Sequence, residues 1–441
     1  MVHTTEDKPQ LVFLKGLLAT MFLRADRWRG WIKSNIAAIS PLAIIFLLLF
    51  AASSVPAQVD NPDETSADAA SQAAARVHPA EKPSRHLVNI TIAYPIGTNQ
   101  NPDISTNLRW SFLYGRIGEV RGLAYNSGVS LIQRNLYGVQ VTGLYSQVGG
   151  NFRGGALTIG LNYHAGDSKG AQLAGLVNFN QGSFWGLQFA SLFNYTEDRF
   201  WGAQATSLFN LNDGSGSFLQ VAGIANANAG DFSGVQLTAF FNYTNGECRG
   251  VQLGNLNTAS RMRGIQFGLA NLAGEMRGLQ VGLVNLAGQH HGWPVGVVNL
   301  AENSNEDWIT YASNLAAFNT GIRTTINRWY SMLTVGAGDL QEKHQNTAFL
   351  SWHYGRVFPL GRLLSLNLDL GFVHIMPEKS DDPDVNDEMR PAAQVRLLLE
   401  ALISKKTKLF GGIGTSSVAS SYSDEATSED YALFVLGLSL F

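Results

Sequence analysis

The only adjacent pair of histidines, His290-His291, is the first candidate for chemistry in this sequence. Neighbouring imidazoles can bind a metal ion when further ligands converge on them. The nearest acids, Glu275 and Glu302, lie in other connections between the expected strands. We therefore interpret the pair as part of a solvated turn and predict no metal site.

The remaining reactive side chains form no recognisable catalytic pattern. The single cysteine, Cys248, excludes an internal disulfide and a Cys-rich zinc site, and we interpret it as a free thiol in the turn 244–249. The sequence has no Gly-x-Ser-x-Gly elbow, phosphate-binding loop or His-Glu-x-x-His motif. We predict no catalytic residue, no cofactor and no enzymatic activity. The alternative is an outer-membrane hydrolase with Ser, His and an acid or amide on a barrel wall.

The charge of the chain restricts the partners that it is expected to bind. The formal net charge is −3, so the chain lacks the basic footprint of a protein that binds nucleic acid. Two acidic segments are interpreted as solvated loops, with weak uptake of divalent cations as the alternative. Their residues are Asp381, Asp382, Asp384, Asp387 and Glu388, then Asp424, Glu425, Glu429 and Asp430.

An internal repeat is the strongest signal in the sequence. Its origin is the glycine of a Gly-x-Gln motif, which recurs at every sixteenth position and, after Gly250, at every fourteenth. Gly154 and Phe218 occupy origins that lack the full motif. The repeat comprises eleven units over residues 138–301, with origins at Gly138, Gly154, Gly170, Gly186, Gly202, Phe218, Gly234, Gly250, Gly264, Gly278 and Gly292.

Glutamine follows most origins by two positions, and asparagine closes the same segment. Rows of amides could bind a ligand. They could equally be structural, with Gln paired across strands or lining a neutral lumen and Asn bonded to backbone near a turn. We prefer the structural interpretation. The residues assigned to this repeat ladder are Gln172, Gln188, Gln204, Gln220, Gln236, Gln252, Gln266, Gln280, Asn178, Asn194, Asn210, Asn226, Asn242, Asn271 and Asn285.

Each unit alternates between two faces over about ten residues, which is typical of a half-buried strand. In the unit that starts at Gly186, Leu187 and Phe189 share one face, and Gln188 and Asn194 share the other. Every charged residue between 138 and 300 lies outside these segments, so none is expected inside a strand. The exclusion indicates that one face meets lipid or core, since a Lys or Arg at the midplane of a bilayer costs roughly 2–4 kcal/mol.

From residue 327 onward the sequence predicts strands joined alternately by long and short connections. This alternation is typical of an outer-membrane barrel, with long loops outside and short turns in the periplasm. The terminal Phe441 fits such a barrel, but it lies on the opposite face from Leu436, Leu438 and Leu440. The expected strands are Trp329–Gly336, Thr347–Phe358, Leu364–Ile375, Pro391–Leu402, Leu409–Val418 and Tyr431–Phe441.

Two all-β architectures fit these patterns. The first is an antiparallel outer-membrane β-barrel whose wall includes the repeat strands. The second is a flattened β-solenoid, with one unit per coil and stacked Gln and Asn, joined to a β-barrel-like C-terminal part. The shortening of the unit after Gly250 favours the solenoid, because a corner or bulge absorbs a deletion more easily than a straight strand. We predict the barrel and keep the solenoid as the alternative.

The N-terminal part is expected to direct export. Basic residues precede an apolar run, Ile36–Ser53, and Val55 and Ala57 suit a signal-peptidase site. We predict a signal peptide over residues 1–57, for which Met21 would be a more typical start, with a single transmembrane anchor as the alternative. The other predicted parts are a disordered leader at 58–86, N-terminal β-strands at 87–137 and C-terminal barrel hairpins at 302–441.

Two segments resemble the bacterial surface-repeat-containing proteins of the cell envelope. They are Gly278-Leu279-Gln280-Val281-Gly282-Leu283-Val284-Asn285-Leu286-Ala287 and Tyr94-Pro95-Ile96-Gly97-Thr98-Asn99. The resemblance covers roughly residues 88–375. It implies a place in the envelope, generally without known activity, and it transfers no functional residue.

We therefore expect a non-enzymatic protein of the outer membrane or cell surface, with outer-membrane lipid as a partner. Its expected role is structural, or that of a passive pore for small neutral solutes, because the expected inner face is uncharged. The alternative is a surface-exposed, adhesin-like repeat scaffold that binds a partner through its ladders.

Overall fold

The computed structural model describes residues 84–99, 101–339, 347–376, 390–420 and 427–441. The predicted signal peptide and most of the predicted leader fall outside these ranges. Residues Lys82–Phe441 form one compact unit, which contains a parallel β-solenoid of about 14 turns followed by a closed antiparallel barrel of eight strands. None of the described residues forms a helix long and apolar enough to cross a membrane.

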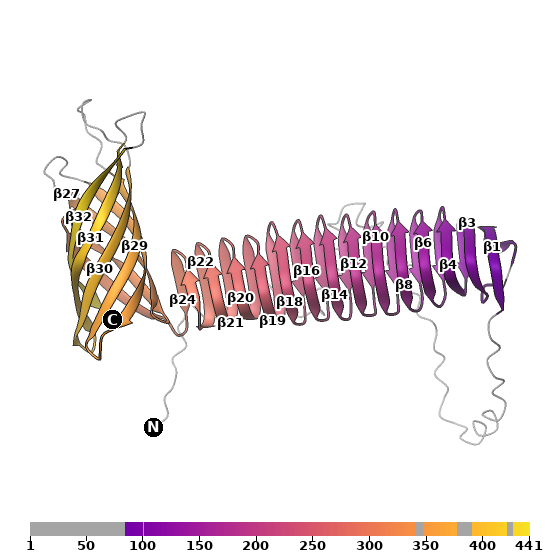
Figure 1. Cartoon of the computed structure of the whole chain (residues 1–441), viewed down its shortest axis with the longest axis horizontal. Coiled ribbons are helices and arrows are strands. Elements are labelled where there is room, and N and C mark those ends of the chain that lie inside the picture. The colour runs from indigo at the N-terminus through magenta and orange to yellow at the C-terminus, as the bar shows by residue number, and fades with distance from the viewer. Residues whose placement is uncertain (1–83, 100, 340–346, 377–389, 421–426) are drawn as a thin grey trace, which may run out of the picture. The chain divides into compact units, whose positions relative to one another are not determined.

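The repeat units form the solenoid and take no part in the barrel wall (Figure 1). One 16-residue unit makes one coil from a seven-residue strand and a four-residue strand, such as β12 (Phe184–Ala190) and β13 (Phe193–Thr196). Successive coils pair in parallel and in register, so that Gly170 lies opposite Gly186 and Gln172 opposite Gln188. The prediction of an antiparallel barrel built from the repeats is wrong, and the alternative of a solenoid joined to a C-terminal barrel is confirmed.

The physical reason is the corner between the two strands of each unit. The alternation was interpreted as one straight strand, but the chain turns between Ala190 and Phe193, so Gln188 and Asn194 both project into the same interior. The other strands of the first and the 16-residue coils are β1 (Arg85–Ala93), β2 (Ile96–Gly97), β3 (Ser105–Ile117), β4 (Glu119–Asn126), β5 (Val129–Ile132), β6 (Leu136–Thr142), β7 (Tyr145–Val148), β8 (Phe152–Thr158), β9 (Leu161–His164), β10 (Ser168–Ala174), β11 (Val177–Asn180), β14 (Phe200–Thr206), β15 (Phe209–Asn212), β16 (Gly216–Ala222), β17 (Ala225–Asn228) and β18 (Phe232–Thr238).

The 14-residue coils are shortened at both corners. Three residues separate Leu237 from Phe241, whereas two separate Leu253 from Leu256. At the other corner β19, β20 and β21 run through without a break, whereas β22 and β23 are separate strands. The inner residues stay in register, with Gln252 opposite Gln266. The strands of this region are β19 (Phe241–Leu253), β20 (Leu256–Phe267), β21 (Ala270–Val281), β22 (Val284–His290), β23 (Trp293–Val295) and β24 (Val298–Ala301).

The origin glycine is required by the close approach of neighbouring coils. Gly186 has a φ of 137°, and a Cβ at this position would lie 1.9 Å from the carbonyl oxygen of Gly170. A positive φ is unfavourable for residues with a side chain. Phe218 occupies the same position in one coil with a φ of 97°, so that coil holds a strained backbone.

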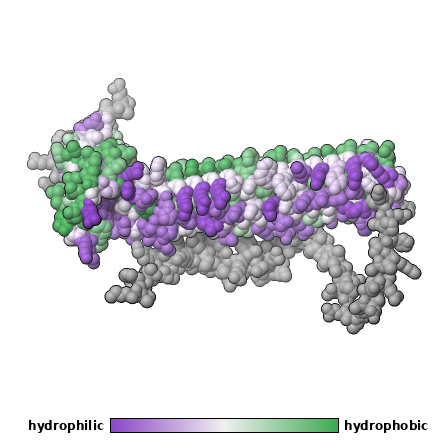
Figure 2. Space-filling view, turned by 60° about the horizontal axis from the view of Figure 1, so that its bottom comes forward, coloured by the Kyte–Doolittle hydropathy of each residue, from purple (hydrophilic) through white to green (hydrophobic). Residues whose placement is uncertain are grey.

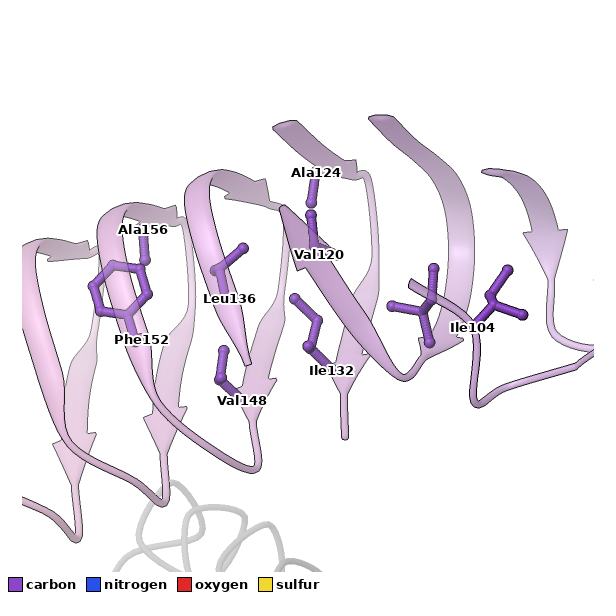
Figure 3. Close-up of a cluster of buried hydrophobic side chains, with 9 residues drawn as sticks. Ile104, Val120, Ala124, Ile132, Leu136, Val148, Phe152 and Ala156 are labelled. Atoms are coloured by element: carbon purple, nitrogen blue, oxygen red, sulfur yellow. The ribbon is translucent and has the colours of Figure 1, made fainter. Parts of the chain in front are cut away.

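The first coils contain a buried apolar cluster. Figure 3 shows this cluster, and its members are Ile104, Ile117, Val120, Ala124, Ile132, Leu136, Val148, Phe152 and Ala156. Further along the chain polar ladders lie beside a continuing, mainly apolar column.

The C-terminal barrel closes because its first strand pairs with its last. The six strands expected from the sequence are present, and two that sequence reasoning did not delimit, β25 and β26, complete the ring. Leu436, Leu438 and Leu440 point outward, and Phe441 lies just beyond the end of the last strand. The strands are β25 (Asn305–Ser313), β26 (Ala316–Ile326), β27 (Trp329–Asp339), β28 (Ala348–Pro359), β29 (Leu364–Met376), β30 (Arg390–Ser404), β31 (Thr407–Ser420) and β32 (Thr427–Leu440).

The strand pairing of the barrel shows at which of its ends the chain enters from the solenoid. Residues 302–304 connect β24 to β25, and β25 begins at the end that carries the short turns 327–328, 360–363 and 405–406. The C-terminal Phe441 follows β32 at that same end.

Candidate functional site

The asparagines of the repeat form a continuous ladder inside the solenoid. Each is at most 2% exposed from Asn162 to Asn299. The side-chain Nδ2 of each asparagine donates to Oδ1 of the asparagine in the next coil, at 2.8–3.0 Å. It also donates to a backbone oxygen of that coil, as Asn210 does to Val221 O at 2.8 Å. The ladder therefore bonds side chain to side chain and side chain to backbone.

The glutamines form a second ladder with the opposite polarity. Gln204 Nε2 donates to Gln188 Oε1 of the preceding coil at 2.7 Å, and the same bond recurs from Gln188 to Gln280 at 2.7–3.0 Å. All eight predicted glutamines are fully buried. Because both ladders are enclosed and their groups bond one another, they are not accessible to a partner. The alternative hypothesis predicted a scaffold that binds a partner through its ladders, and this mode of binding is therefore wrong.

A third polar column was missed by the sequence reasoning. It lies eight positions after the glutamine and contains Asn180, Thr196, Asn212, Asn228 and Thr244, each at most 2% exposed. Its members complete the hydrogen bonding of the glutamines; Asn180 Nδ2 donates to Gln172 Oε1 at 2.8 Å and Gln172 Nε2 donates back to Asn180 Oδ1 at 2.9 Å. Recurrence of these polar residues at the period of the repeat was the signal that would have found the column.

A fourth column, two positions before the origin, is mainly apolar and corrects two interpretations. It contains Phe184, Phe200, Phe232, Cys248, Met262, Met276 and His290, all at most 1% exposed. Cys248 is thus a buried thiol in β19, whose pKa burial raises to about 12, and does not lie in an open turn. His290 continues the column of Met276, and burial lowers its pKa to about 4, whereas His291 is exposed. The solvated-turn interpretation holds for His291 alone.

Two further buried basic side chains stand among these columns. His164 is fully buried in the third column, its Nδ1 lies 2.6 Å from Gln172 Nε2, and burial lowers its pKa to about 3. Arg109 is fully buried near the N-terminal end, where Nη1 donates to Ser130 Oγ at 3.3 Å and burial lowers its pKa to about 9. Neither group faces a carboxylate with which it could form a catalytic pair in the described contacts.

The outer face of the solenoid is apolar on both strands and at the corner between them. Leu187 and Phe189, which flank the buried Gln188, are 46% and 42% exposed. Aromatic rings stack along the shorter strands, as Phe179 does on Tyr195 with centroids 4.7 Å apart. A groove of about 920 Å³ follows this corner from Ala222 to Val297, lined mostly by Val, Leu, Phe, Gly and Ala. Trp352 of the barrel also lines it, and its Nε1 donates to Gly296 O at 3.1 Å.

Charged residues gather at the opposite edge of the coils. They are not confined to connections as predicted, because Arg153, Lys169 and Arg249 lie within strands, at the residue before the origin glycine. They are exposed there, because this residue points outward beside the charged corner. Glu247 is the exception: it is 7% exposed and pairs with Arg249 at 3.0 Å and Arg263 at 2.7 Å.

The interior of the barrel is polar and charged, in contrast to the uncharged inner face that was expected. Arg323 forms ion pairs with Asp307 at 2.6 Å and with Glu400 at 2.5 Å. Arg396 pairs with Asp369 at 2.8 Å, and Tyr330 donates to the same carboxylate at 2.6 Å. All six of these side chains are at most 5% exposed.

The acidic loops offer little evidence of a cation site. Asp381, Asp382, Asp384, Asp387, Glu388, Asp424 and Glu425 lie outside the described residues. Glu429 and Asp430 lie in β32, where Glu429 accepts a hydrogen bond from the hydroxyl of Tyr431. Within the described part of the chain, no three His, Cys, Asp or Glu residues are grouped to hold a metal ion.

Comparisons with models of protein families, with curated proteins and with solved structures gave no match. The resemblance to surface-repeat-containing envelope proteins therefore stays a prediction.

Proposed function

We propose that this chain is a non-enzymatic repeat scaffold, held in the outer membrane by its C-terminal barrel and binding its partner through the outer face of the solenoid. The proposal also includes export through a cleaved signal peptide. The observation that carries it is the polarity of the barrel, which is apolar outside and ionic inside.

The outside of the barrel supports an anchor in lipid. Leu370, Phe434 and Leu436 are 63%, 59% and 63% exposed, while the ion pairs are enclosed. A barrel in water has the reverse arrangement, whereas a barrel in hydrocarbon has this one. The closed ring also leaves no unpaired strand edge, which is the condition for placing β-structure in a membrane.

The inside of the barrel favours an anchor over a pore. Eight strands enclose a space just wide enough for side chains. Here Arg323, Arg396 and their carboxylates occupy it, and cavities inside the described part of the barrel measure about 20 Å³ and about 200 Å³. The larger cavity is lined by Asp307, Arg323, Glu400 and Lys408, so it suits neutral solutes poorly.

The test uses the full-length protein, with membrane extraction, gel mobility and conductance as readouts. We expect extraction only with detergent, a heat-dependent shift in gel mobility, and no steady conductance after reconstitution in planar bilayers. A protein that dissolves without detergent and shows no shift refutes the anchor. Reproducible conductance steps that become larger in the Arg396→Met variant would refute the scaffold and indicate a pore.

A further inference from the structure

The solenoid has an inverted distribution of polarity. Its interior holds amide ladders, and its exterior exposes large apolar side chains at the corner after each glutamine strand. Leu144, Ile159, Phe240 and Leu283 at this corner are 65%, 75%, 58% and 57% exposed. Soluble monomers rarely expose apolar patches larger than a few hundred Å², and this one continues through the coils. Figure 2 shows it as a band along one long edge of the solenoid.

The apolar edge carries no formal charge. From residue 127 to residue 297 every corner consists of Gly, Ser, Ala, Asn, Leu, Ile, Val or Phe. Charged residues such as Arg153, Asp198 and Arg277 lie at the other edge. Each coil is therefore amphipathic from edge to edge, which distinguishes the solenoid from a rod with scattered apolar residues.

The backbone at the apolar edge needs no water. Leu144 N donates to Gly128 O at 2.9 Å, and Leu176 N donates to Gly160 O at 3.0 Å. The same bond between successive coils joins Leu192 N to Leu176 O at 3.0 Å. Hydrocarbon tolerates a backbone only when its polar groups are bonded internally, and these corners meet that condition.

The depth of the apolar zone matches one leaflet. From the residue after the origin glycine to the corner the chain extends over five residues, which at about 3.3 Å each span roughly 16 Å. Half of a hydrocarbon core of about 30 Å is about 15 Å. Trp185 and Trp201 are 42% and 57% exposed and lie at the boundary between the apolar zone and the charged edge, where interfacial aromatic residues are enriched.

The covalent link keeps the solenoid close to one membrane surface. Four peptide steps from Ala301 to Asn305 reach at most about 14 Å. Asn305 begins β25 at the end of the barrel with the short turns. A solenoid attached there starts at the surface of any membrane that the barrel spans.

We propose that the solenoid lies edge-on in one leaflet of the membrane that the barrel spans, with its apolar edge among the acyl chains and its charged edge in water. The inference rests on the proposed function, of which it names the partner as lipid. A fluid partner also suits an edge whose period changes, because the repeat unit shortens from 16 to 14 residues after Gly250. A rigid partner of a different sequence would have to match both periods of the repeat.

The experiment places an environment-sensitive fluorophore on cysteines that are introduced one at a time into the full-length protein in liposomes. Leu144→Cys, Leu176→Cys and Leu283→Cys report on the apolar edge, Ser233→Cys on the charged edge, and Leu370→Cys on the barrel exterior. These positions are exposed or lie at the surface, so the substitutions leave the core intact. The unsubstituted chain controls for labelling of the buried Cys248. Brominated lipid and aqueous iodide are the two quenchers.

We expect brominated lipid to quench the three edge labels and the barrel label, and iodide to quench them several-fold less than the label at position 233. Edge labels that iodide reaches while the barrel label stays in lipid overturn the inference and leave the anchor intact. A barrel label that iodide reaches overturns both. If the edge labels are shielded from both quenchers, and the shielding is lost when each vesicle holds one protein, the edge contacts a second copy. This result also overturns the inference.

Discussion

Replacing Gln204 by methionine removes one amide from the middle of the glutamine ladder while keeping the length of the side chain. Gln204 Nε2 donates to Gln188 Oε1 at 2.7 Å and to Asn212 Oδ1 at 3.2 Å. Gln204 Oε1 accepts from Gln220 Nε2 at 2.9 Å and from Asn212 Nδ2 at 3.1 Å. At about 1 kcal/mol net for each bond, the loss is about 4 kcal/mol, before any cost of the partners left unpaired.

Gln280→Met is the matched control at the end of the same ladder. Gln280 is equally buried, but it makes one side-chain bond, from Nε2 to Gln266 Oε1 at 2.8 Å, and its Oε1 has no hydrogen-bond partner. Among the described contacts Gln266 Oε1 accepts this bond alone, so Gln280→Met removes one unpaired buried oxygen and creates another, and these two costs roughly cancel. The expected loss is therefore that of one bond, about 1 kcal/mol, and the difference between the two variants is about 3 kcal/mol.

Native-state hydrogen exchange is the appropriate assay, because a solenoid opens locally and a single free energy of unfolding does not describe it. Since about 1.4 kcal/mol changes an equilibrium tenfold, Gln204→Met should accelerate exchange in peptides spanning 184–228 by roughly 100-fold or more. Gln280→Met should accelerate exchange in 264–301 by only about fivefold. Equal acceleration by both substitutions, or none by Gln204→Met, would refute the reasoning that the ladder bonds stabilise the coils.

Three further predictions concern single positions. Because the pKa of His164 is about 3 in the folded coil against 6.5 for the free side chain, the unfolded coil binds the proton first as pH falls. Local stability should therefore decline below pH 6.5 by up to about 1.4 kcal/mol per unit, and His164→Asn should remove this dependence in hydrogen exchange. Arg396→Met leaves Asp369 buried without its cation and should cost about 3–5 kcal/mol, seen as a lower temperature for the gel shift; adding Asp369→Asn should restore much of it. Phe218→Gly removes the side chain from a residue with positive φ and should stabilise its coil by about 1 kcal/mol, which slows hydrogen exchange there. Gly202→Ala should destabilise its coil and accelerate exchange. The opposite order would contradict the strain argument.

Much of the secondary structure followed from local pattern. The six predicted C-terminal strands correspond to β27–β32 with ends that differ by a few residues, because each alternates apolar and polar side chains between unequal connections. The two preceding strands, β25 and β26, are not set between such unequal connections, so their ends were not predicted. The repeat period also placed Gln188 and Asn194 on a common face, where the structure buries both.

The sequence reasoning failed where a corner mimics a strand. Ala190, Ser191 and Leu192 continue the alternation of the unit without glycine or proline, so the local pattern contains no sign of the turn between β12 and β13. The third column of Asn and Thr was overlooked because it follows that corner. His290 and Cys248 were assigned to turns because their neighbours are polar, although the stacking of coils buries both.

The sequence by itself determined the period of the repeat, the all-β character and the separation of charged from apolar positions, because these depend on residue order alone. Only the tertiary structure decided that equivalent residues of successive units lie one above another. That decision depends on backbone bonds between segments one repeat unit apart and on contacts such as Gly186 against the carbonyl of Gly170. It is this stacking that encloses the amides and leaves the apolar edge outside.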